Sequence, residues 1–287
     1  MFSTLIQAEE LHALLSSGED LVVVDCRHDL LHPDAGLTLY AEGHIPGSVF
    51  AHMDNDLSGP HESVGDGRHP WPSAAKFHRT LQEWNVRTST QVVAYDGSNG
   101  AFAARLWYLL RMLGHDAVAV LDGGLARWNS LGYPLATSLS DASPAPRASG
   151  GFHRNGFNES RLVDAVGVAK RLARGRLLID SRAADRFAGM NETIDRVAGH
   201  VPGAVNRPFA LNLADDGRFK SADELRAEFL SLLDGHAPSE VMVMCGSGVT
   251  AAHNLLAMQH AGLDGASLFK GSWSGWIENP SNPVISP

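Results

Sequence analysis

The stretch GHIPGSV, residues 43–49, recurs in the second half of the chain as GHVPGAV, residues 199–205. Three further blocks accompany each copy in the same order. They read LVVVDCRHDL, QVVAYDGSNGAFAARLWYLL and AVAVLDGGLARW in the first half, and RLLIDSRAADRF, EVMVMCGSGVTAAHNLLAM and ASLFKGSWSGW in the second. A repeated order of four blocks indicates two copies of one domain. We expect domains over 1–136 and 158–287, joined by a linker rich in Pro, Ser, Ala and Gly over 137–157.

Each copy alternates short β-branched apolar runs with longer segments of helical period. LVVV, QVVAY and AVAVL are typical of buried strands, whereas AAKFHRTLQEW and ADELRAEFLSLL space their apolar residues as helices do. This alternation predicts an α/β fold with two tandem domains, each a parallel sheet flanked by helices. In such sheets, functional groups gather on the loops beyond the carboxyl ends of the strands.

The composition is that of a folded globular protein, with 44% hydrophobic and 19% charged residues. A net charge of −9 argues against nucleic acid as a partner. The amino terminus lacks the basic start of a signal peptide, and no apolar run is long enough to span a bilayer, so we expect no membrane partner. Two cysteines, Cys26 and Cys245, are too few for a disulfide scaffold and fit a reducing, cytoplasmic compartment.

Cys245 ends the strand EVMVM, and a Gly-Ser-Gly turn follows before a helical pattern begins near Thr250. Gly246 and Gly248 permit positive φ and close approach of the backbone, so N–H groups can turn toward the sulfur as an anion-binding nest. The start of the helix adds a partial positive charge. Both effects favour a reactive thiolate. A buried structural cysteine is the usual alternative, but two glycines in three residues serve no evident purpose in a core.

The repeat provides an internal control for this cysteine. The position that matches Cys245 in the first copy is Asp96, in YDGSNGAFAARL, so that copy has the loop without the nucleophile. We expect Asp96 to cap the following helix or to hold the domain interface. Cys26 is matched by Ser181 and is followed by no glycine loop, which favours a structural role for it.

The two GHxPG blocks, the strands that end in Asp-x-Arg, the cysteine loop and the blocks LDGGLARW and FKGSWSGW together resemble the tandem rhodanese family of sulfurtransferases. The resemblance covers almost the whole chain. The hexad CGSGVT, residues 245–250, is similar to the active loop of the 3-mercaptopyruvate sulfurtransferase branch. Thiosulfate-preferring members place basic residues directly after the cysteine, whereas positions 246 and 247 carry no charge here. Because thiosulfate is a dianion, an uncharged loop is the poorer host for it.

The resemblance also implies roles for residues outside the cysteine itself. In the mercaptopyruvate branch, the second residue after the cysteine is a serine that forms a relay with a histidine and an aspartate, which here would be Ser247, His69 and Asp54. Two arginines hold the carboxylate and ketone of the substrate, and they would be Arg186 and Arg196. The second stands in NETIDRVAGH, without the prolines of the family motif. The other loop residues expected at the substrate are Gly246, Gly248, Val249 and Thr250.

The resemblance implies sulfur transfer in two steps. The Cys245 thiolate takes the sulfur of 3-mercaptopyruvate, pyruvate leaves, and the persulfide passes its outer sulfur to a small thiol, cyanide or a thioredoxin-like acceptor. Thiosulfate sulfurtransferase is the alternative, and a noncatalytic persulfide carrier is a third hypothesis. A cysteine phosphatase is disfavoured because position 251, where it needs an arginine, is Ala251. Neither a metal-binding spacing nor a dinucleotide-binding motif occurs, so we expect no metal and no cofactor.

Overall fold

The computed structural model describes residues 1–137 and 155–286, which form two compact units. The first comprises Met1–Gly59, Pro72–Asn158 and Asp215–Arg218, and the second comprises Pro60–Trp71, Glu159–Ala214 and Phe219–Pro287. The units therefore do not follow chain order, because Pro60–Trp71 comes from the first half of the sequence and belongs to the second unit. Most of the linker expected over 137–157 lies outside the described residues.

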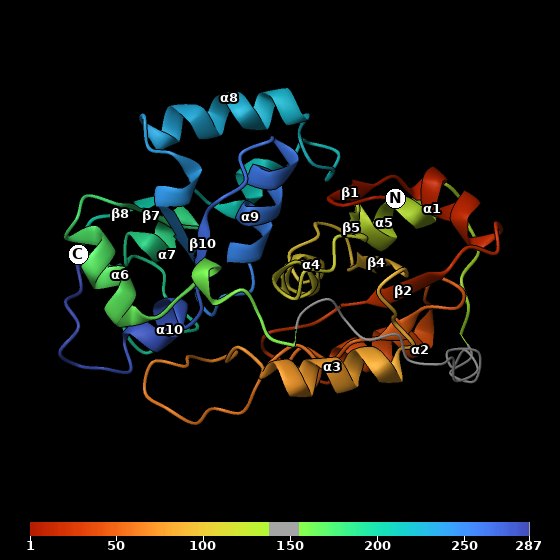
Figure 1. The fold of residues 1–287 in the computed structure, drawn as a ribbon, viewed down its shortest axis with the longest axis horizontal. Helices are drawn as coiled ribbons and strands as arrows, with labels where there is room; N and C mark the ends of the chain where they lie inside the picture. Colours follow the sequence, from red (N-terminus) through yellow and green to blue (C-terminus); the bar gives the residue numbers. More distant parts are fainter. Residues whose placement is uncertain (138–154, 287) are drawn as a thin grey trace. The chain divides into compact units, whose positions relative to one another are not determined.

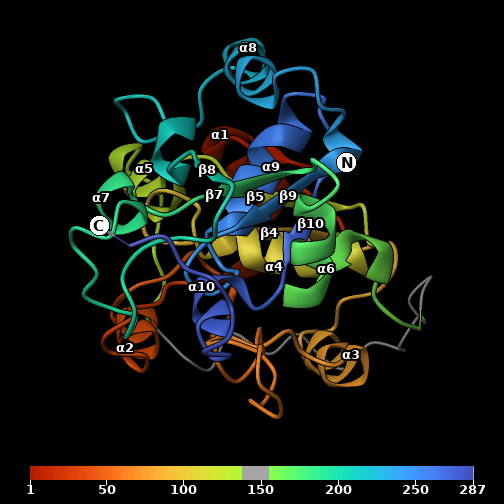
Figure 2. The same ribbon diagram turned by 90° about the vertical axis from the view of Figure 1, so that its left-hand side faces the viewer.

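Each unit contains a five-stranded parallel sheet, and the two sheets have the same topology (Figure 1, Figure 2). The strand order is β1-β5-β4-β2-β3 in the first unit and β6-β10-β9-β7-β8 in the second. Matching blocks of sequence therefore form matching strands in the two sheets. The expected α/β fold of two tandem parallel-sheet domains is confirmed. The strands span Leu5–Ile6 (β1), Leu21–Asp25 (β2), Val49–Phe50 (β3), Gln91–Tyr95 (β4), Val118–Leu121 (β5), Leu162–Val163 (β6), Leu177–Asp180 (β7), Ala204–Asn206 (β8), Val241–Met244 (β9) and Ser267–Phe269 (β10).

Helices form the connections between the strands, because parallel neighbours need a crossover. In the first unit α1 packs against α5, and α4 packs on β4 and β5. In the second unit α9 contacts β9, β10 and α8, while α6 contacts α10 (Figure 1). The helices span Ala8–Leu15 (α1), Ala35–Glu42 (α2), Ala74–Glu83 (α3), Ala103–Met112 (α4), Gly124–Ser130 (α5), Ala165–Leu172 (α6), Ala184–Phe187 (α7), Ala222–Leu233 (α8), Ala251–His260 (α9) and Ser272–Trp276 (α10).

The strand β9 is covered on both faces, which explains its continuous apolar sequence. All four of its residues are fully buried. Met242 and Met244 pack with Trp273 in one core cluster. The alternate residues point to the opposite face, which α9 covers, because successive side chains of a strand point to opposite sides. The sheet thus delivers the residue that follows β9, Cys245, to its carboxyl edge.

The strands β2 and β7 each end in a buried ion pair at their Asp-x-Arg sequence. Arg27 Nη2 lies 2.6 Å from Asp25, and Arg182 Nη2 lies 2.7 Å from Asp180. Each arginine also donates to the glycine carbonyl of its own GHxPG block at 2.8 Å. The Asp-x-Arg and GHxPG motifs therefore bind each other within each of the two units, and their role is structural.

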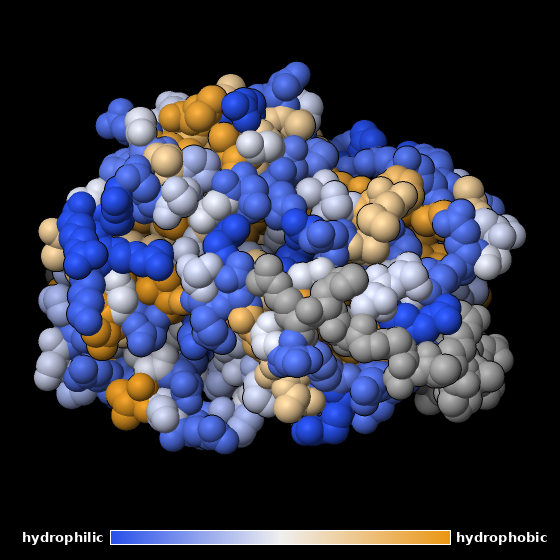
Figure 3. All heavy atoms as spheres, viewed as in Figure 1, coloured by the Kyte–Doolittle hydropathy of each residue, from blue (hydrophilic) through white to orange (hydrophobic). Residues whose placement is uncertain are grey.

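The face of the molecule drawn in Figure 3 is mostly polar. Figure 3 shows a largely hydrophilic face with hydrophobic residues in small patches. Exposed apolar side chains in the described residues, such as Leu31 and Met190, are of the kind that folded proteins commonly carry. No described helix is both long enough and apolar enough to cross a membrane.

Candidate active site

Cys245 is fixed at the carboxyl end of β9 by the turn that begins α10. Its N–H donates to the Oγ of Ser272 at 3.1 Å, and its carbonyl accepts from the N–H of Trp273 at 3.0 Å. The carbonyl of Gly246 accepts from the N–H of Ser274 at 2.8 Å. The cysteine is 1% exposed. The backbone on both sides of the sulfur is therefore held in place before any substrate binds.

The loop between β9 and α9 aims a backbone donor at the sulfur. The N–H of Gly248 donates to Cys245 Sγ at 3.2 Å. Gly248 has a φ of +78°, a left-handed conformation that residues with a Cβ adopt only with strain. This N–H is therefore placed to donate to negative charge that develops on the sulfur. Because α9 begins at Ala251, directly after Thr250, its partial positive charge lies just beyond the loop.

The matching loop of the first unit holds a carboxylate in place of a sulfur. Asp96 follows β4, and its side chain accepts hydrogen bonds of 2.9 to 3.3 Å from the N–H groups of Ser98, Gly100, Phe102 and Ala103. Burial raises the pKa of this carboxyl above its ordinary value, although the four hydrogen bonds oppose that effect. Asp96 thus caps the start of α4, as expected. The first unit also demonstrates that this type of loop converges N–H groups on an acidic side chain.

Ser247 forms a short hydrogen bond with His69. The Nδ1 of His69 lies 2.7 Å from the Oγ of Ser247, and the two residues are 3% and 5% exposed. Because His69 belongs to Pro60–Trp71, this contact lies inside the second unit. The structure therefore brings together the serine and the histidine of the relay that the resemblance implied, and their part in proton transfer remains a prediction.

The segment Pro60–Trp71 reaches this position because its backbone packs on α10. The N–H of Gly65 donates to the carboxylate of Glu278 at 2.6 Å. A Cβ added to Gly271 would lie only 2.0 Å from the carbonyl oxygen of Gly65. Glycine at position 271 therefore permits the close approach that carries His69 to the cysteine loop.

Arg186, in α7, lies beside the loop and is engaged by two buried carboxylates. Glu192 accepts hydrogen bonds of 2.9 to 3.1 Å from its Nε and Nη2, and Asp195 accepts from Nη2 at 3.0 Å. Burial raises the pKa of Glu192, but hydrogen bonds from Arg186 and from backbone N–H groups outweigh it, so this pKa lies below its ordinary value. A Cβ on Gly246 would lie 3.6 Å from Arg186 Nη2, so the guanidinium adjoins the cysteine loop.

Arg196 and Asp54, which the resemblance also nominated, have other contacts. Arg196 donates from Nη2 to the carbonyl of Ile277. Asp54 belongs to the first unit, where its N–H donates to the Nδ1 of His52 at 3.2 Å. Their roles at the substrate remain predictions.

Comparison with known proteins identifies a rhodanese-like domain twice in this chain, over residues 7–131 and 164–279. The chain belongs to the rhodanese family. It is 45% identical over 284 residues to a Pseudomonas aeruginosa protein named "Probable 3-mercaptopyruvate sulfurtransferase", which covers 98% of both chains. It is 40% identical over 283 residues to a Mycobacterium tuberculosis protein named "Putative thiosulfate sulfurtransferase SseB". The match covers 98% of this chain and 96% of the relative.

A solved structure titled 3-mercaptopyruvate sulfurtransferase from Leishmania major superposes with a TM-score of 0.82 at 28% identity, covering 97% of this chain and 76% of that one. The expected family, and the expected relationship to 3-mercaptopyruvate sulfurtransferases, are confirmed. As a member of a sulfurtransferase family, the protein is expected to use a sulfur donor and a thiol acceptor.

The second cysteine of this rhodanese lacks the features of the active loop. Cys26 follows β2 and is 1% exposed. Burial, followed by the charges of Asp25 and Asp96, raises the pKa of its thiol well above the ordinary value. The thiol therefore stays protonated at neutral pH, which makes it a poor nucleophile. This environment supports the structural role that the match with Ser181 indicated.

Two residues that lie at the cysteine loop, Arg68 and Asp195, were not predicted from the sequence. Arg68 Nη1 lies 2.6 Å from Asp195, and a Cβ on Gly246 would lie 3.4 Å from Arg68 Nη2 and 3.7 Å from Asp195 Oδ2. The available signal was the place of Arg68 directly before His69 in GRHPWPS. That signal is weak, because only the folded segment shows which way an isolated arginine points.

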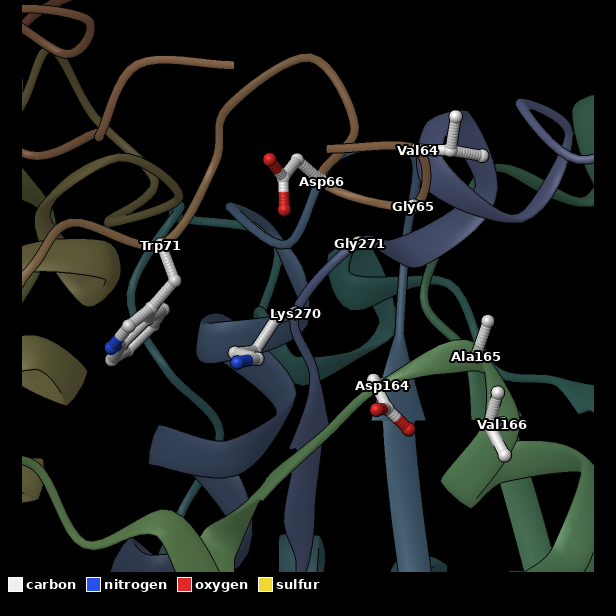
Figure 4. Close-up of a pocket in the computed structure, with 9 residues that line it drawn as sticks. All are labelled: Val64, Gly65, Asp66, Trp71, Asp164, Ala165, Val166, Lys270 and Gly271. Carbon is white, nitrogen blue, oxygen red and sulfur yellow. The ribbon is translucent and has the colours of Figure 1, made fainter. Parts of the chain in front are cut away.

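A separate cavity of about 340 Å³ is lined in part by Gly271. Figure 4 shows the side chains of Asp66, Trp71, Asp164 and Lys270 around it. None of the site residues expected from the sequence lines this cavity, so it is a different site from the one at the cysteine loop. Within residues 1–137 and 155–286, no group of three His, Cys, Asp or Glu side chains could hold a metal ion.

Proposed function

We propose that this protein is a 3-mercaptopyruvate sulfurtransferase that carries the transferred sulfur as a persulfide on Cys245. The hydrogen bond of 2.7 Å between His69 and Ser247, beside a cysteine loop with no charged residue at 246 or 247, is the observation that carries this proposal. The names of the Pseudomonas and Leishmania relatives support it.

In the first half-reaction, the Cys245 thiolate attacks the sulfur of the donor. A sulfur–sulfur bond forms as the sulfur–carbon bond breaks, and the electron pair of that bond leaves on carbon as the enolate of pyruvate. The N–H of Gly248, which already donates to Cys245 Sγ, stabilises the negative sulfur before attack. The guanidinium of Arg186 beside Gly246 holds the donor carboxylate through charge-assisted hydrogen bonds.

The enolate must gain a proton to leave as pyruvate. Ser247 is two residues from the nucleophile, and its hydroxyl can donate to the enolate while His69 supplies a proton behind it. Burial of both Ser247 and His69 shields the transfer from competing water.

In the second half-reaction, an acceptor attacks the outer sulfur of the persulfide and regenerates the Cys245 thiolate. We assign this part to a small thiol, to cyanide or to a thioredoxin-like protein, each of which supplies the electron pair for the new bond to sulfur. Both cysteines are free in the structure. This state fits the reducing cytoplasm, which is the compartment we propose.

Thiosulfate is the second candidate donor, and one observation favours it. The loop itself is uncharged, but the guanidinium groups of Arg68 and Arg186 both lie within 4 Å of a Cβ built on Gly246. Together they could bind a sulfonate. The ratio of kcat/KM for the two donors decides between the candidates. We expect 3-mercaptopyruvate to be preferred by roughly tenfold or more, whereas a preference for thiosulfate would overturn the proposed donor.

A further inference from the structure

The cysteine loop is flanked by two guanidinium groups that face the same point. The nearest atoms to a Cβ built on Gly246 are Arg68 Nη2 at 3.4 Å, Arg186 Nη2 at 3.6 Å and Asp195 Oδ2 at 3.7 Å. Gly246 immediately follows the nucleophile Cys245, so an anion held by both arginines would lie directly beside the reacting sulfur.

Arg68 is held at its backbone and at one edge of its guanidinium. Its backbone N–H donates to Ser274 Oγ at 3.0 Å, and the preceding residue, Gly67, donates to Glu278 at 3.1 Å. Gly67 has a φ of +75°, and a Cβ there would lie 2.5 Å from the carbonyl oxygen of Gly271. The backbone that carries Arg68 therefore packs closely against the start of α10.

The guanidinium of Arg68 has an N–H donor that makes no hydrogen bond within the described residues. Its Nη1 binds Asp195 at 2.6 Å. Its Nε is buried and makes no hydrogen bond within the described part of the chain, and its Nη2 faces Gly246. With 29% of the side chain exposed, the group is reachable from solvent. An incoming carboxylate beside Gly246 could accept a hydrogen bond from Nη2.

Asp195 holds the two arginines together. Its carboxylate binds Arg68 through one oxygen and Arg186 through the other, at 2.6 and 3.0 Å, and is only 3% exposed. Glu192 binds the remaining edge of Arg186. Glu192 also lies 3.5 Å from Arg182, which pairs with Asp180, so three arginines meet three carboxylates here. A cluster of this balanced charge suits a singly charged carboxylate better than a dianion, because it offers hydrogen-bond donors without a large excess of positive charge.

Arg196 is the other candidate for the second arginine of the donor-binding site, and it lies in a different environment. Arg196 was expected from its place in the sequence, yet its Nη2 donates to the carbonyl of Ile277. None of the three atoms nearest to the Gly246 position belongs to it. We propose that Arg68, held by Asp195, is the second arginine of the donor-binding site and that it binds the carboxylate of the donor together with Arg186. The choice of a carboxylate donor rests on the proposed function, whereas the location of the anion site does not.

Steady-state kinetics with 3-mercaptopyruvate provides the first test. Arg68→Met should lower kcat/KM by roughly 10- to 100-fold, the scale of a lost charge-assisted hydrogen bond, chiefly through KM. Arg68→Lys should recover part of the loss, because the charge remains without the planar fork. Arg176→Met is the matched control, since Arg176 pairs with Glu240 at the opposite end of β7. A larger loss in Arg196→Met than in Arg68→Met would overturn the assignment.

Alkylation of Cys245 tests the anion site without any sulfur transfer. Iodoacetate and iodoacetamide both lose iodide to a thiolate, but only iodoacetate carries a carboxylate. The ratio of their rates at Cys245, followed by peptide mass spectrometry, should fall roughly tenfold in Arg68→Met and stay unchanged in Arg176→Met. Arg68→Lys should give an intermediate ratio, which excludes misfolding as the cause. An unchanged ratio in Arg68→Met would overturn the proposal even if the enzyme prefers 3-mercaptopyruvate. A fallen ratio would support it even if the enzyme prefers thiosulfate.

Discussion

The Nδ1 of His69 and the Oγ of Ser247 lie 2.7 Å apart, although 178 positions separate the two residues in the chain. Both belong to the second compact unit, because Pro60–Trp71 packs there rather than with the rest of the first half. A single unit therefore holds the nucleophile, its neighbouring hydroxyl, the imidazole and the two arginines that flank the loop. This arrangement leads to the following predictions.

Ser247→Ala should affect the two donors unequally. If Ser247 protonates the departing enolate, the variant should slow the reaction with 3-mercaptopyruvate by roughly 100- to 10,000-fold. Sulfite, the leaving group from thiosulfate, needs no proton on carbon, so any activity with thiosulfate should largely survive. The ratio of kcat/KM for the two donors measures the difference. Equal losses with both donors would show that the hydroxyl has no role specific to the enolate.

His69→Ala should resemble Ser247→Ala but with a smaller loss, because the imidazole acts through the hydroxyl. The double variant should be less impaired than the product of the two single effects, since the groups work as one unit. A double-mutant cycle on kcat with 3-mercaptopyruvate measures this coupling. Independent effects would mean that the hydrogen bond between them does not serve the reaction.

Gly248→Ala should impair the reaction because of the backbone at this position. With a φ of +78°, alanine here costs about 1 kcal/mol, and relaxing the strain would turn the N–H away from Cys245 Sγ. We expect activity to fall roughly 10- to 100-fold, as for loss of a single donor that stabilises an anion.

Gly235→Ala provides the control for Gly248→Ala. Gly235 has a φ of +86° and nothing within 4 Å of its added Cβ, so it shares the strain but not the site. Its thermal midpoint should fall to a similar extent, and its activity should be normal. Normal activity in Gly248→Ala would contradict a role for the N–H at the sulfur.

Glu192→Gln should destabilise the protein at neutral pH but less so in acid. The folded state lowers the pKa of Glu192 below 4.5, so the stability from its ionised form is complete above that pH and is lost as the pH falls through the folded value. Breaking this buried pair with Arg186 should cost about 3 kcal/mol at pH 7. The difference in thermal midpoint from the wild type should narrow below about pH 4.

Glu159→Gln is the control for Glu192→Gln, since Glu159 is an exposed carboxyl of the same unit. It should change the thermal midpoint little at either pH. A gap between wild type and Glu192→Gln that stays constant with pH would show that the ionised carboxylate is not what stabilises the fold.

The sequence predicted those parts of the molecule that depend on local pattern or on the repeat. Buried strands such as β9 appear as apolar runs, and the two copies of GHxPG indicated two equivalent domains. The position of Cys245 followed from the rule that parallel strands end at one edge. The repeat placed Asp96 at the same position in the other copy, but the sequence left open whether it caps a helix or holds the domain interface, and the hydrogen bonds of its side chain identify it as a cap.

Contacts between distant segments could not be read from the sequence. Gly65 and Gly271 meet because neither has a side chain, and no periodicity in the chain records that pairing. The same limitation concealed Arg68 and its link to Asp195, because opposite charges far apart in a sequence have many possible partners. The resemblance to the family nominated Arg196 by position, whereas the structure reveals which guanidinium groups adjoin Gly246.

Mass spectrometry of the sulfur-loaded protein tests the central claim most directly. The protein is treated with 3-mercaptopyruvate in the absence of an acceptor and then digested. The peptide that contains Cys245 should gain the mass of one sulfur atom, the peptide that contains Cys26 should gain none, and Cys245→Ser should gain none anywhere. Subsequent addition of a small thiol should remove the added mass. An added sulfur on Cys26, or catalytic turnover by Cys245→Ser, would contradict the account.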